Sequence, residues 1–410
     1  MKLISAYRTL AEKMVFQQNN KDFNMPDSVL KIVSFAYTEE EAQIACHLGF
    51  IPRTAKAIAR KVKRPLHEIE PVLKSLSDRL LIVSVTTKNK TVYSLLPLLP
   101  GIFELQIAVN RYKDEEHARQ FARLFEDFYS ELGEIVTPVL DDREKFEIMR
   151  IIPIEQSIKG ISGLNTIAFP SDFFSEIIDR NTTFALAECV CRSSADLLGN
   201  GCDKPKDVCT GMGIIADLLI DKGLARRVSK EEFIDAKVRA AEAGLVNFVD
   251  NLVDPMQVCS CCGCCCVGLR LLTQHNFPAF IANSHFESVI DTQNCQGCGQ
   301  CIEWCPVKAI SLNDKKSAID YSRCIGCGVC ASKCSNNSIS MKERANYQPP
   351  PDNIINYGIH RYLEVKKHDK NGLIPRATLG MGRLLSTFVQ PKVAGPKYKY
   401  NPDFFGKKPQ

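Results

Sequence analysis

The segment 295–334 carries one four-cysteine pattern twice, first as Cys295-Gln-Gly-Cys298-Gly-Gln-Cys301-Ile-Glu-Trp-Cys305-Pro306 and then as Cys324-Ile-Gly-Cys327-Gly-Val-Cys330-Ala-Ser-Lys-Cys334. Each copy has the spacing C-x2-C-x2-C-x3-C, which is typical of [4Fe–4S] ligation. Three thiolates on a glycine-containing loop can close on three corners of one cubane, whereas the fourth enters the following helix and points away. A pattern this long rarely repeats by chance, so iron–sulfur ligation is favoured over zinc or inert thiols.

The double pattern resembles that of bacterial two-cluster ferredoxins. The resemblance implies two [4Fe–4S] clusters with exchanged fourth ligands, one held by Cys295, Cys298, Cys301 and Cys334 and the other by Cys324, Cys327, Cys330 and Cys305. Ser335 stands where the second copy would carry its proline, a departure that leaves ligation intact. Between the copies, the alternating segments 309–312 and 317–321 flank residues 313–316 and predict a β-hairpin over the clusters.

Length and composition predict an intracellular protein of several domains. A chain of 410 residues exceeds what one hydrophobic core usually supports, so two or three domains are expected. Residues 1–20 lack the apolar core and cleavage signature of a signal peptide, and no apolar run is long enough to predict a membrane span. The 19 cysteines are therefore expected to stay reduced in the cytoplasm. The net charge of +5 is too modest to indicate a nucleic-acid ligand.

Ten further cysteines lie between residues 189 and 266, and the first four predict a third metal centre. These four are Cys189, Cys191, Cys202 and Cys209. The alternating segment 185–191 puts Cys189 and Cys191 on one face of an extended chain. Arg192 beside them could offset the negative charge of a thiolate-ligated centre. An iron–sulfur cluster is favoured as the occupant, and a zinc ion stays open as the alternative.

The other six cysteines stand in Cys259-Ser-Cys261-Cys262-Gly-Cys264-Cys265-Cys266, ahead of a segment, 267–272, that predicts the start of a helix. Adjacent cysteines cannot all face one metal in regular structure. Spacings of three and four residues single out candidate ligands, namely Cys259, Cys262, Cys265 and Cys266. Three alternatives stay open: a fourth cubane with spare thiols, one larger or non-cubane site shared with the first group, or an inert buried run.

The N-terminal region predicts three helices followed by a hairpin. Thr38-Glu-Glu-Glu41 is a capping box that opens the first helix, and helices over 54–61 and 66–79 follow. Strands over 80–85 and 91–95 form the hairpin. This order resembles the winged helix-turn-helix family over about residues 28–100.

The winged-helix resemblance raises the question of DNA binding. Half of the residues in 53–64 are basic, which suits phosphate contacts. The third helix, however, carries Glu68, Glu70 and Asp78, which make a poor surface for reading bases. Protein docking is therefore favoured over DNA binding.

The middle of the chain reads as mainly helical. Helices are expected over 117–132, 173–179, 207–220 and 230–243. The phrases Pro100-Gly-Ile-Phe-Glu104, Ile152-Pro-Ile154 and Cys189-Val-Cys-Arg192, with the cysteine-rich run, resemble a family of anaerobic iron–sulfur proteins that fuse a helical cysteine-rich domain to a dicluster ferredoxin. The resemblance covers most of the chain and implies an architecture and a redox role, but no substrate.

Together these patterns predict an α+β, multidomain protein in four parts. Residues 1–100 form a winged-helix-like domain, 101–282 a mainly helical Cys-rich domain, 283–345 a ferredoxin-like dicluster domain, and 346–410 a Pro-rich linker with an extended basic arm. The arm is expected either to order on a partner or to remain a basic tail.

The sequence has no P-loop, no dinucleotide-binding glycine pattern, no His-Glu-x-x-His and no nucleophile elbow. We therefore expect an electron-transfer protein, or a subunit of a larger complex, that relays low-potential electrons through two [4Fe–4S] clusters and one or two further centres to a redox partner. Two alternatives are an oxidoreductase with its active centre among Cys189–Cys266 and a redox-responsive winged-helix regulator of transcription.

Overall fold

The computed structural model describes residues 2–15, 25–87, 90–139, 147, 149–164, 170–275, 281–345 and 347–351. Helices and strands occur throughout these ranges, which confirms the α+β class. The chain divides into two compact units, one containing Met1–Glu134 and Asp196–Asn200 and the other containing Ile135–Ala195 and Gly201–Asp352. Within the described ranges, no helix combines the length and the apolar character that crossing a membrane requires.

The first unit is mostly helical, with one small sheet. Thr38 and Glu41 form the predicted capping box through both reciprocal hydrogen bonds. The sheet has the order β1-β3-β2, and its β2–β3 pair is the predicted hairpin. The helices are α1 (Lys2–Met14), α2 (Asp27–Ala36), α3 (Glu39–Ala45), α4 (Ala55–Val62), α5 (Leu66–Asp78), α6 (Phe103–Asn110) and α7 (Glu115–Val139), and the strands are β1 (Arg53–Thr54), β2 (Ile82–Thr87) and β3 (Lys90–Leu95).

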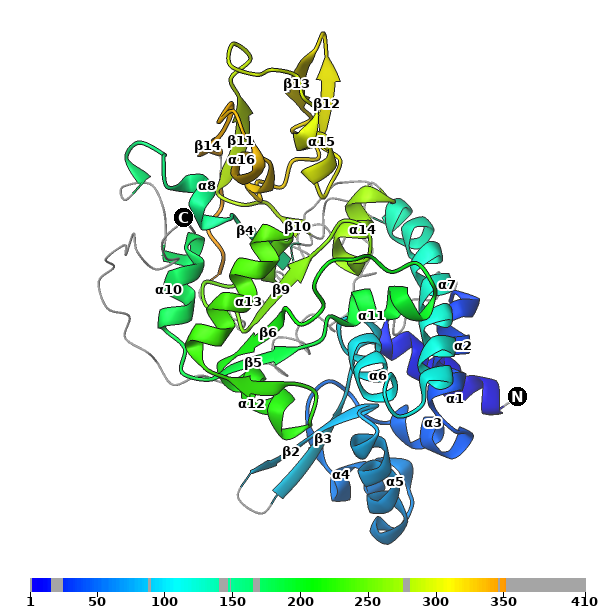
Figure 1. Cartoon of the computed structure of the whole chain (residues 1–410). Coiled ribbons are helices and arrows are strands. Elements are labelled where there is room, and N and C mark those ends of the chain that lie inside the picture. The colour runs from blue at the N-terminus through cyan, green and yellow to red at the C-terminus, as the bar shows by residue number, and fades with distance from the viewer. Residues whose placement is uncertain are drawn as a thin grey trace. The chain divides into compact units, whose positions relative to one another are not determined.

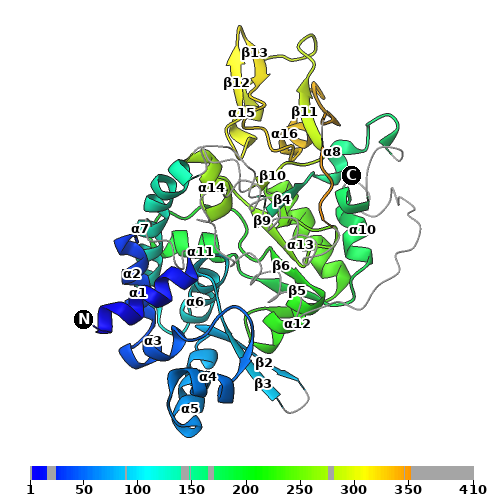
Figure 2. The same cartoon turned by 180° about the vertical axis from the view of Figure 1, so that it is seen from behind.

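A seven-stranded sheet organises the second unit (Figures 1 and 2). Its order is β10-β4-β8-β9-β6-β5-β7, and every neighbouring pair is antiparallel except β10–β4. The strands are β4 (Met149–Ile152), β5 (Phe184–Ala187), β6 (Cys209–Met212), β7 (Arg226–Val228), β8 (Val246–Asp250), β9 (Gln257–Cys261) and β10 (Ile281–Ala282). The helices around them are α8 (Glu155–Ile158), α10 (Phe174–Asp179), α11 (Val190–Leu197), α12 (Gly213–Asp221), α13 (Lys230–Glu242) and α14 (Val267–Thr273).

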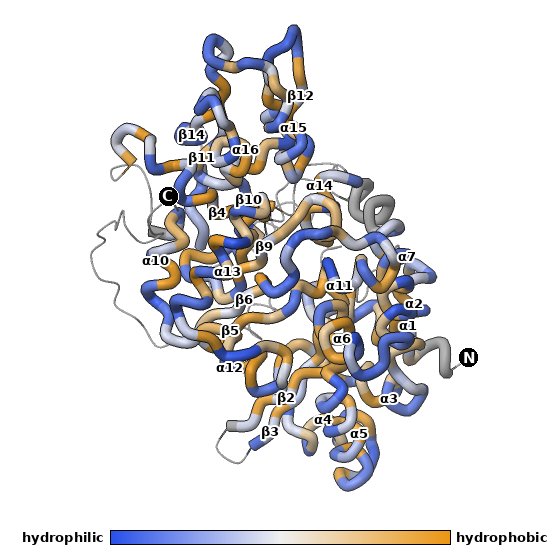
Figure 3. The backbone as a smooth tube through the Cα atoms, in the orientation of Figure 1, coloured by the Kyte–Doolittle hydropathy of each residue, from blue (hydrophilic) through white to orange (hydrophobic). Residues whose placement is uncertain are grey.

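The two faces of this sheet bury different partners, because side chains alternate along each strand. Ile152 and Val258 point to one face, where they pack with Phe174 of α10 and Phe233 of α13. Residues of opposite parity, including Ile151 of β4 and Cys261 of β9, point to the other face. Hydrophobic colouring runs along β9, β6 and β5 in Figure 3, as expected for strands that are covered on both faces.

The expectation of a mainly helical middle missed this sheet. Helices over 117–132 and 230–243 are confirmed as parts of α7 and α13. The helix expected over 207–220 is wrong at its start, because residues 209–212 form β6 and pair with β5 and β9. The extended segment expected over 185–191 is wrong at its end, since Cys191 already lies in α11.

The segment from Phe286 to Glu343 contains two short helices and two two-stranded sheets. The β12–β13 pair is the predicted hairpin, and β11 pairs with β14. In both cysteine loops the glycine before the second cysteine has a left-handed φ, 66° at Gly297 and 70° at Gly326, and a Cβ there would overlap a backbone carbonyl. The elements are β11 (Phe286–Ile290), α15 (Gln300–Trp304), β12 (Ile310–Asn313), β13 (Lys316–Ile319), α16 (Val329–Lys333) and β14 (Ile339–Glu343).

The linker and arm that the sequence predicts at the C-terminus lie largely outside the described residues. Of the Pro-rich linker and basic arm expected over 346–410, the structure describes residues 347–351 alone. Within that stretch, Tyr347 stacks on His285 with ring centroids 4.2 Å apart, and the Pro351 carbonyl accepts a hydrogen bond from the Val253 amide.

Candidate iron–sulfur centres

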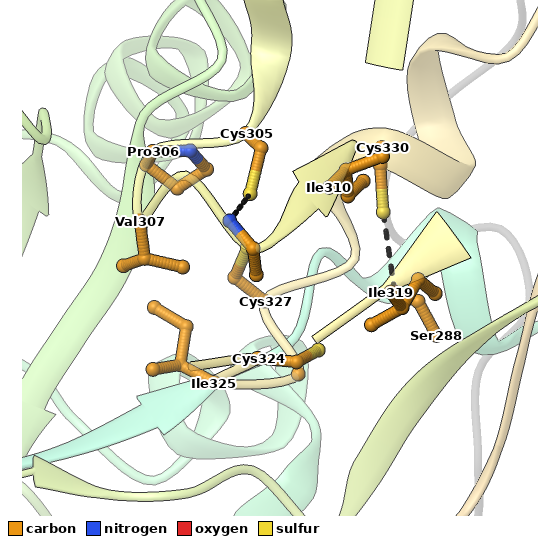
Figure 4. A pocket seen from close by; sticks show the side chains of 12 residues that line it. Ser288, Cys305, Pro306, Val307, Ile310, Ile319, Cys324, Ile325, Cys327 and Cys330 are labelled. Atoms are coloured by element: carbon orange, nitrogen blue, oxygen red, sulfur yellow. Dashed lines mark hydrogen bonds between the residues drawn. The ribbon is translucent and has the colours of Figure 1, made fainter. Parts of the chain in front are cut away.

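The second cysteine repeat borders a pocket that four thiols share. Cys324, Cys327 and Cys330 come from the loop before α16 and from its first turn, and Cys305 comes from the residue after α15 (Figure 4). The pocket and the solvent at its mouth together make up about 320 Å³ of space without protein atoms, and the remaining walls of the pocket are mainly apolar. The structure thus brings together the four residues that the ferredoxin resemblance implied for one cluster, including the crossing Cys305.

Burial and hydrogen bonds distinguish the sulfurs of this pocket. The Cys305 Sγ accepts a hydrogen bond from the Ala309 amide at 3.2 Å, and the Cys330 Sγ lies 3.2 Å from the Ser288 hydroxyl (Figure 4). Burial raises the pKa of Cys330 to about 12 and also raises the pKa of Cys327. Buried thiols of this kind ionise only when a cation compensates the charge, so deprotonation and metal binding are coupled there.

The first repeat has a matching arrangement around Ser317. The Ser317 hydroxyl lies 3.2 Å from the Cys301 Sγ and accepts a hydrogen bond from the Cys295 thiol at 3.8 Å. Backbone amides of Ser317 and Gly297 lower the pKa of Cys295, which favours its thiolate. Cys334 packs into the same apolar cluster as Cys301, whereas Cys298 is exposed to solvent. These are the four residues implied for the other cluster.

Six cysteines of the middle segment form one continuous row of thiols, here called the six-thiol group. Cys259, Cys261 and Cys266 pack in one buried cluster, and successive members of the row shift one another's pKa in the order Cys189, Cys191, Cys266, Cys261, Cys259, Cys209. The register of β6 and β9 explains one contact: Thr210 pairs with Val258, so Cys209 and Cys259 are the next neighbours along the ladder. Cys259 and Cys261 share a face of β9 because they are two residues apart.

The other four cysteines form a second, compact cluster, here called the four-thiol group. Its sulfurs lie within 4.8 Å of one another, and its members are Cys202, Cys262, Cys264 and Cys265. Hydrogen bonds from the thiol and amide of Cys265 lower the pKa of Cys262 to about 4, despite its burial. A thiolate therefore forms readily in this group.

The structure thus groups the middle cysteines differently from their order in the sequence. Cys202 was expected with Cys189, Cys191 and Cys209, but it lies with Cys262 in the four-thiol group. Of the candidate set Cys259, Cys262, Cys265 and Cys266, the first and last lie in the six-thiol group, and the other two lie in the four-thiol group.

Two buried cations accompany these thiols. Arg192, only 1% exposed, donates through Nη1 to the Ser260 carbonyl at 3.0 Å and to the Cys262 Sγ at 3.8 Å. Burial opposes its charge, but the neighbouring Cys189 and Cys262 raise its pKa above the ordinary value. Lys237, which is 3% exposed, donates to the Val258 carbonyl at 2.7 Å, and burial lowers its pKa to about 8.

Sequence reasoning identified Arg192 from its position beside two cysteines but missed Lys237 and the serines that contact sulfur. Lys237 is twenty-eight residues from Cys209 and lies on an ordinary amphipathic helix, so no local pattern marks it. Ser288 and Ser317 are likewise common strand residues. Only tertiary structure brings them to the thiols.

The middle sheet and the dicluster segment share one hydrophobic core. Cys261 and Cys266 pack in the same buried cluster as Cys324 and Cys327. The Ile154 amide donates a hydrogen bond to the Cys327 carbonyl at 3.0 Å. The two cysteine-rich regions are therefore parts of one packed structure.

Comparison with known proteins identifies the class of the C-terminal segment. Residues 287–335 match a family described as the 4Fe-4S dicluster domain, and this match spans both cysteine repeats. The chain therefore contains a dicluster domain of iron–sulfur electron-transfer type. Comparisons with curated proteins and with solved structures return no match.

Proposed function

We propose that this protein relays low-potential electrons through [4Fe–4S] clusters to a redox partner. The single observation that supports this function best is the dicluster domain at residues 287–335, whose two repeats together bring Cys305, Cys324, Cys327 and Cys330 to one pocket. A [4Fe–4S] cluster supplies one-electron transfer when it is bound. The first cluster would be held by the other four cysteines of the repeats, with Cys334 as the crossing ligand.

The surroundings of the thiols fit this role. Serine hydroxyls lie within 3.3 Å of three sulfurs, as Ser288 does with Cys330, Ser317 with Cys301, and Ser338 with Cys334. Hydrogen bonds to cluster sulfurs and limited solvent exposure are the means by which proteins set reduction potentials. The chain's own residues would thus tune the two clusters separately.

The middle thiols extend the relay. Their shared core with Cys324 and Cys327 of the dicluster domain supports one or two additional centres beside the cluster of the second repeat. Cys189, Cys191 and Cys209 are candidate ligands of such a centre, with zinc as the alternative occupant at the middle site.

The N-terminal helices support a docking role better than a DNA-binding role. At the third helix, which would enter the major groove, two basic side chains are paired with carboxylates: Arg64, just before the helix, with Glu40 and Glu68, and Lys74 with Asp78. Paired cations have less charge to offer to phosphates. We propose that this winged-helix-like domain binds a protein partner within a larger, cytoplasmic complex of an anaerobic cell, and that the protein is a subunit rather than a stand-alone catalyst.

Stopped-flow spectroscopy of the anaerobically purified full chain tests the relay. A low-potential donor should bleach the visible absorbance of the clusters, and an added one-electron acceptor should restore it without any substrate. Cys327→Ser should lose the part of this signal that comes from one cluster, whereas the control Cys46→Ser should keep all of it. A chain that is reduced but cannot pass electrons to any acceptor would contradict the proposed function.

A further inference from the structure

Two pairs of adjacent cysteines in the run 259–266 are divided between the two thiol groups. Cys261 ends β9 and belongs to the six-thiol group, whereas Cys262 belongs to the four-thiol group. Cys265 belongs to the four-thiol group, whereas Cys266, the extended N-cap residue of α14, contacts Cys191. Neighbouring Cα atoms are about 3.8 Å apart. The two groups therefore lie back to back on a single loop.

Arg192 lies between these groups with unused hydrogen-bonding capacity. Its Nη1 reaches Cys262 of the four-thiol group, and among the six-thiol group Cys189 raises its pKa most strongly. Among the described residues, neither its Nε nor its Nη2 has a hydrogen-bond partner, although both atoms are buried. A buried guanidinium with two orphaned donors is costly unless an anion lies against it.

We propose that the ten middle cysteines build two separate back-to-back metal centres, with the six-thiol and four-thiol groups as ligand sets and Arg192 as their common counter-charge. This inference deepens the proposed relay and rests on it for the redox role of the six-thiol centre. The two centres take their ligands from the same loop, so neither is complete unless the 259–266 run has folded. The run of five cysteines around Gly263 follows from this arrangement, because the pairs Cys261–Cys262 and Cys265–Cys266 each supply one thiol to each side.

The two ligand sets differ in what they can hold. Six thiols exceed the four that one cubane or one zinc ion requires, so the six-thiol centre is a polynuclear iron–sulfur centre drawing on this row. Around a single tetrahedral ion with metal–sulfur bonds of about 2.3 Å, sulfurs stand roughly 3.8 Å apart. The spacing of the four-thiol group, within 4.8 Å for every pair, fits such a single ion.

Burial separates the two centres further. The four-thiol group includes Cys264, which is exposed to solvent, whereas no member of the six-thiol group is exposed. The six-thiol row also has the buried cation Lys237 nearby, which the charges of Cys209 and Cys259 stabilise. A strongly anionic occupant is thus balanced by cations on two sides.

The decisive test is the behaviour of Cys202. Full-length variants Cys202→Ser, Cys265→Ser and Cys191→Ser are purified anaerobically, and their iron, zinc and sulfide contents and EPR spectra are compared with those of the natural chain. We expect Cys202→Ser and Cys265→Ser to lose the same metal, and Cys191→Ser to lose iron and sulfide that both of them retain. Cys46→Ser, outside both groups, is the matched control.

Two outcomes would overturn the inference. One is that Cys202→Ser loses the same metal and signal as Cys191→Ser, which would restore the grouping by sequence order. The other is that none of the three variants loses metal. Neither outcome bears on electron transfer by the dicluster domain, whose signals and transfer to an acceptor are measured in the same samples, so a failure of the relay is recognised separately.

Arg192 is tested as a positioning residue through the reduction potential. Arg192→Met removes the charge and keeps much of the side-chain length, whereas Arg192→Lys keeps the charge. We expect the methionine variant to make the six-thiol centre harder to reduce, and the lysine variant to recover most of the difference. If Arg192 only filled space, both variants would change thermal stability without moving the potential, and that result would remove Arg192 from the proposal.

Discussion

The Cα of Gly263 lies directly against the backbone of Pro306, so that a Cβ added at Gly263 would lie 1.8 Å from the Pro306 carbonyl oxygen. Gly263 stands in the middle of the cysteine-rich loop, and Pro306 follows the crossing ligand Cys305. The contact therefore packs the cysteine-rich loop directly against the segment that follows Cys305. It also explains why the run of cysteines is interrupted by glycine.

Gly263→Ala should loosen this contact. Because the added methyl group meets backbone rather than a flexible side chain, we expect unfolding free energy to fall by about 1–3 kcal/mol, the usual range for overpacking. Thermal denaturation of the anaerobic full chain measures the change. Gly160→Ala is the control, since a Cβ at Gly160 meets nothing within 4 Å. Equal melting temperatures for the two variants would mean that the contact between Gly263 and Pro306 does not affect stability.

Cys305→Ala tests the exchange of ligands between the repeats. Since Cys305 lines the pocket of Cys324, Cys327 and Cys330, its removal should damage that cluster and leave the cluster of its own repeat. The EPR spectrum of the reduced variant should match that of Cys324→Ala. Cys301→Ala provides the complementary spectrum. If the EPR spectrum of Cys305→Ala instead resembles that of Cys301→Ala, each repeat binds its own cluster, and the predicted exchange of fourth ligands is wrong.

Local patterns predicted well wherever ligands are close in sequence. The repeats, the hairpin between them and the capping box of Thr38 depend on residues a few positions apart, and all are present in the structure. The sheet of the second unit was missed because its strands are only two to five residues long and lie between helices. Short strands such as β6, with Gly211 in its interior, have weak periodicity and form through pairing with distant partners.

The partition of the middle cysteines could not be predicted for a related reason. Spacing along the chain assigned Cys202 to its sequence neighbours, but the turn between α11 and β6 carries it to Cys262, sixty residues further on. Tertiary packing, rather than local sequence, determines the position of this turn. Counting residues therefore identified eight candidate ligands among the ten middle cysteines but not their grouping.

His285 should make stability depend on pH. Its ring is 3% exposed and lies 2.8 Å from Asp172 and 3.3 Å from Glu343. Burial disfavours the charged ring, but the hydrogen bonds and charges of both carboxylates outweigh it and raise the pKa of His285. The ion pair is therefore fully present below the unfolded-state pKa of about 6.5 and is lost as pH rises through the folded-state pKa.

Melting temperatures measured across this range check the effect. The natural chain should lose stability on the alkaline side relative to its value near about pH 6, and His285→Asn should have a flatter profile. The slopes of melting temperature against pH are compared between the two proteins, because the pH dependence of all other titratable groups is common to both. Parallel profiles for the two proteins would show that His285 does not change charge in this range.

The N-terminal domain should not bind duplex DNA as a winged-helix regulator does. Arg64 is engaged by Glu40 and Glu68, and Arg79 by Glu41, so the cations that flank the third helix have little charge left for phosphates. Electrophoretic mobility shifts should show no retention of DNA at about 0.1 M salt. Glu40→Gln/Glu68→Gln, which frees Arg64, is the matched variant and should bind DNA more strongly than the natural chain. Binding by the natural chain with affinity that falls steeply with salt would favour the regulator.

The central claim is that this chain is an iron–sulfur electron carrier, and iron and sulfide analysis coupled to EPR of the anaerobically reduced full chain tests it most directly. The two repeats alone predict about eight iron atoms and an equal amount of sulfide per chain, with the interacting signals of two reduced [4Fe–4S] clusters. Iron from the six-thiol centre would add to this number. Fewer than about four iron atoms, or zinc in place of iron at the repeats, would contradict the account.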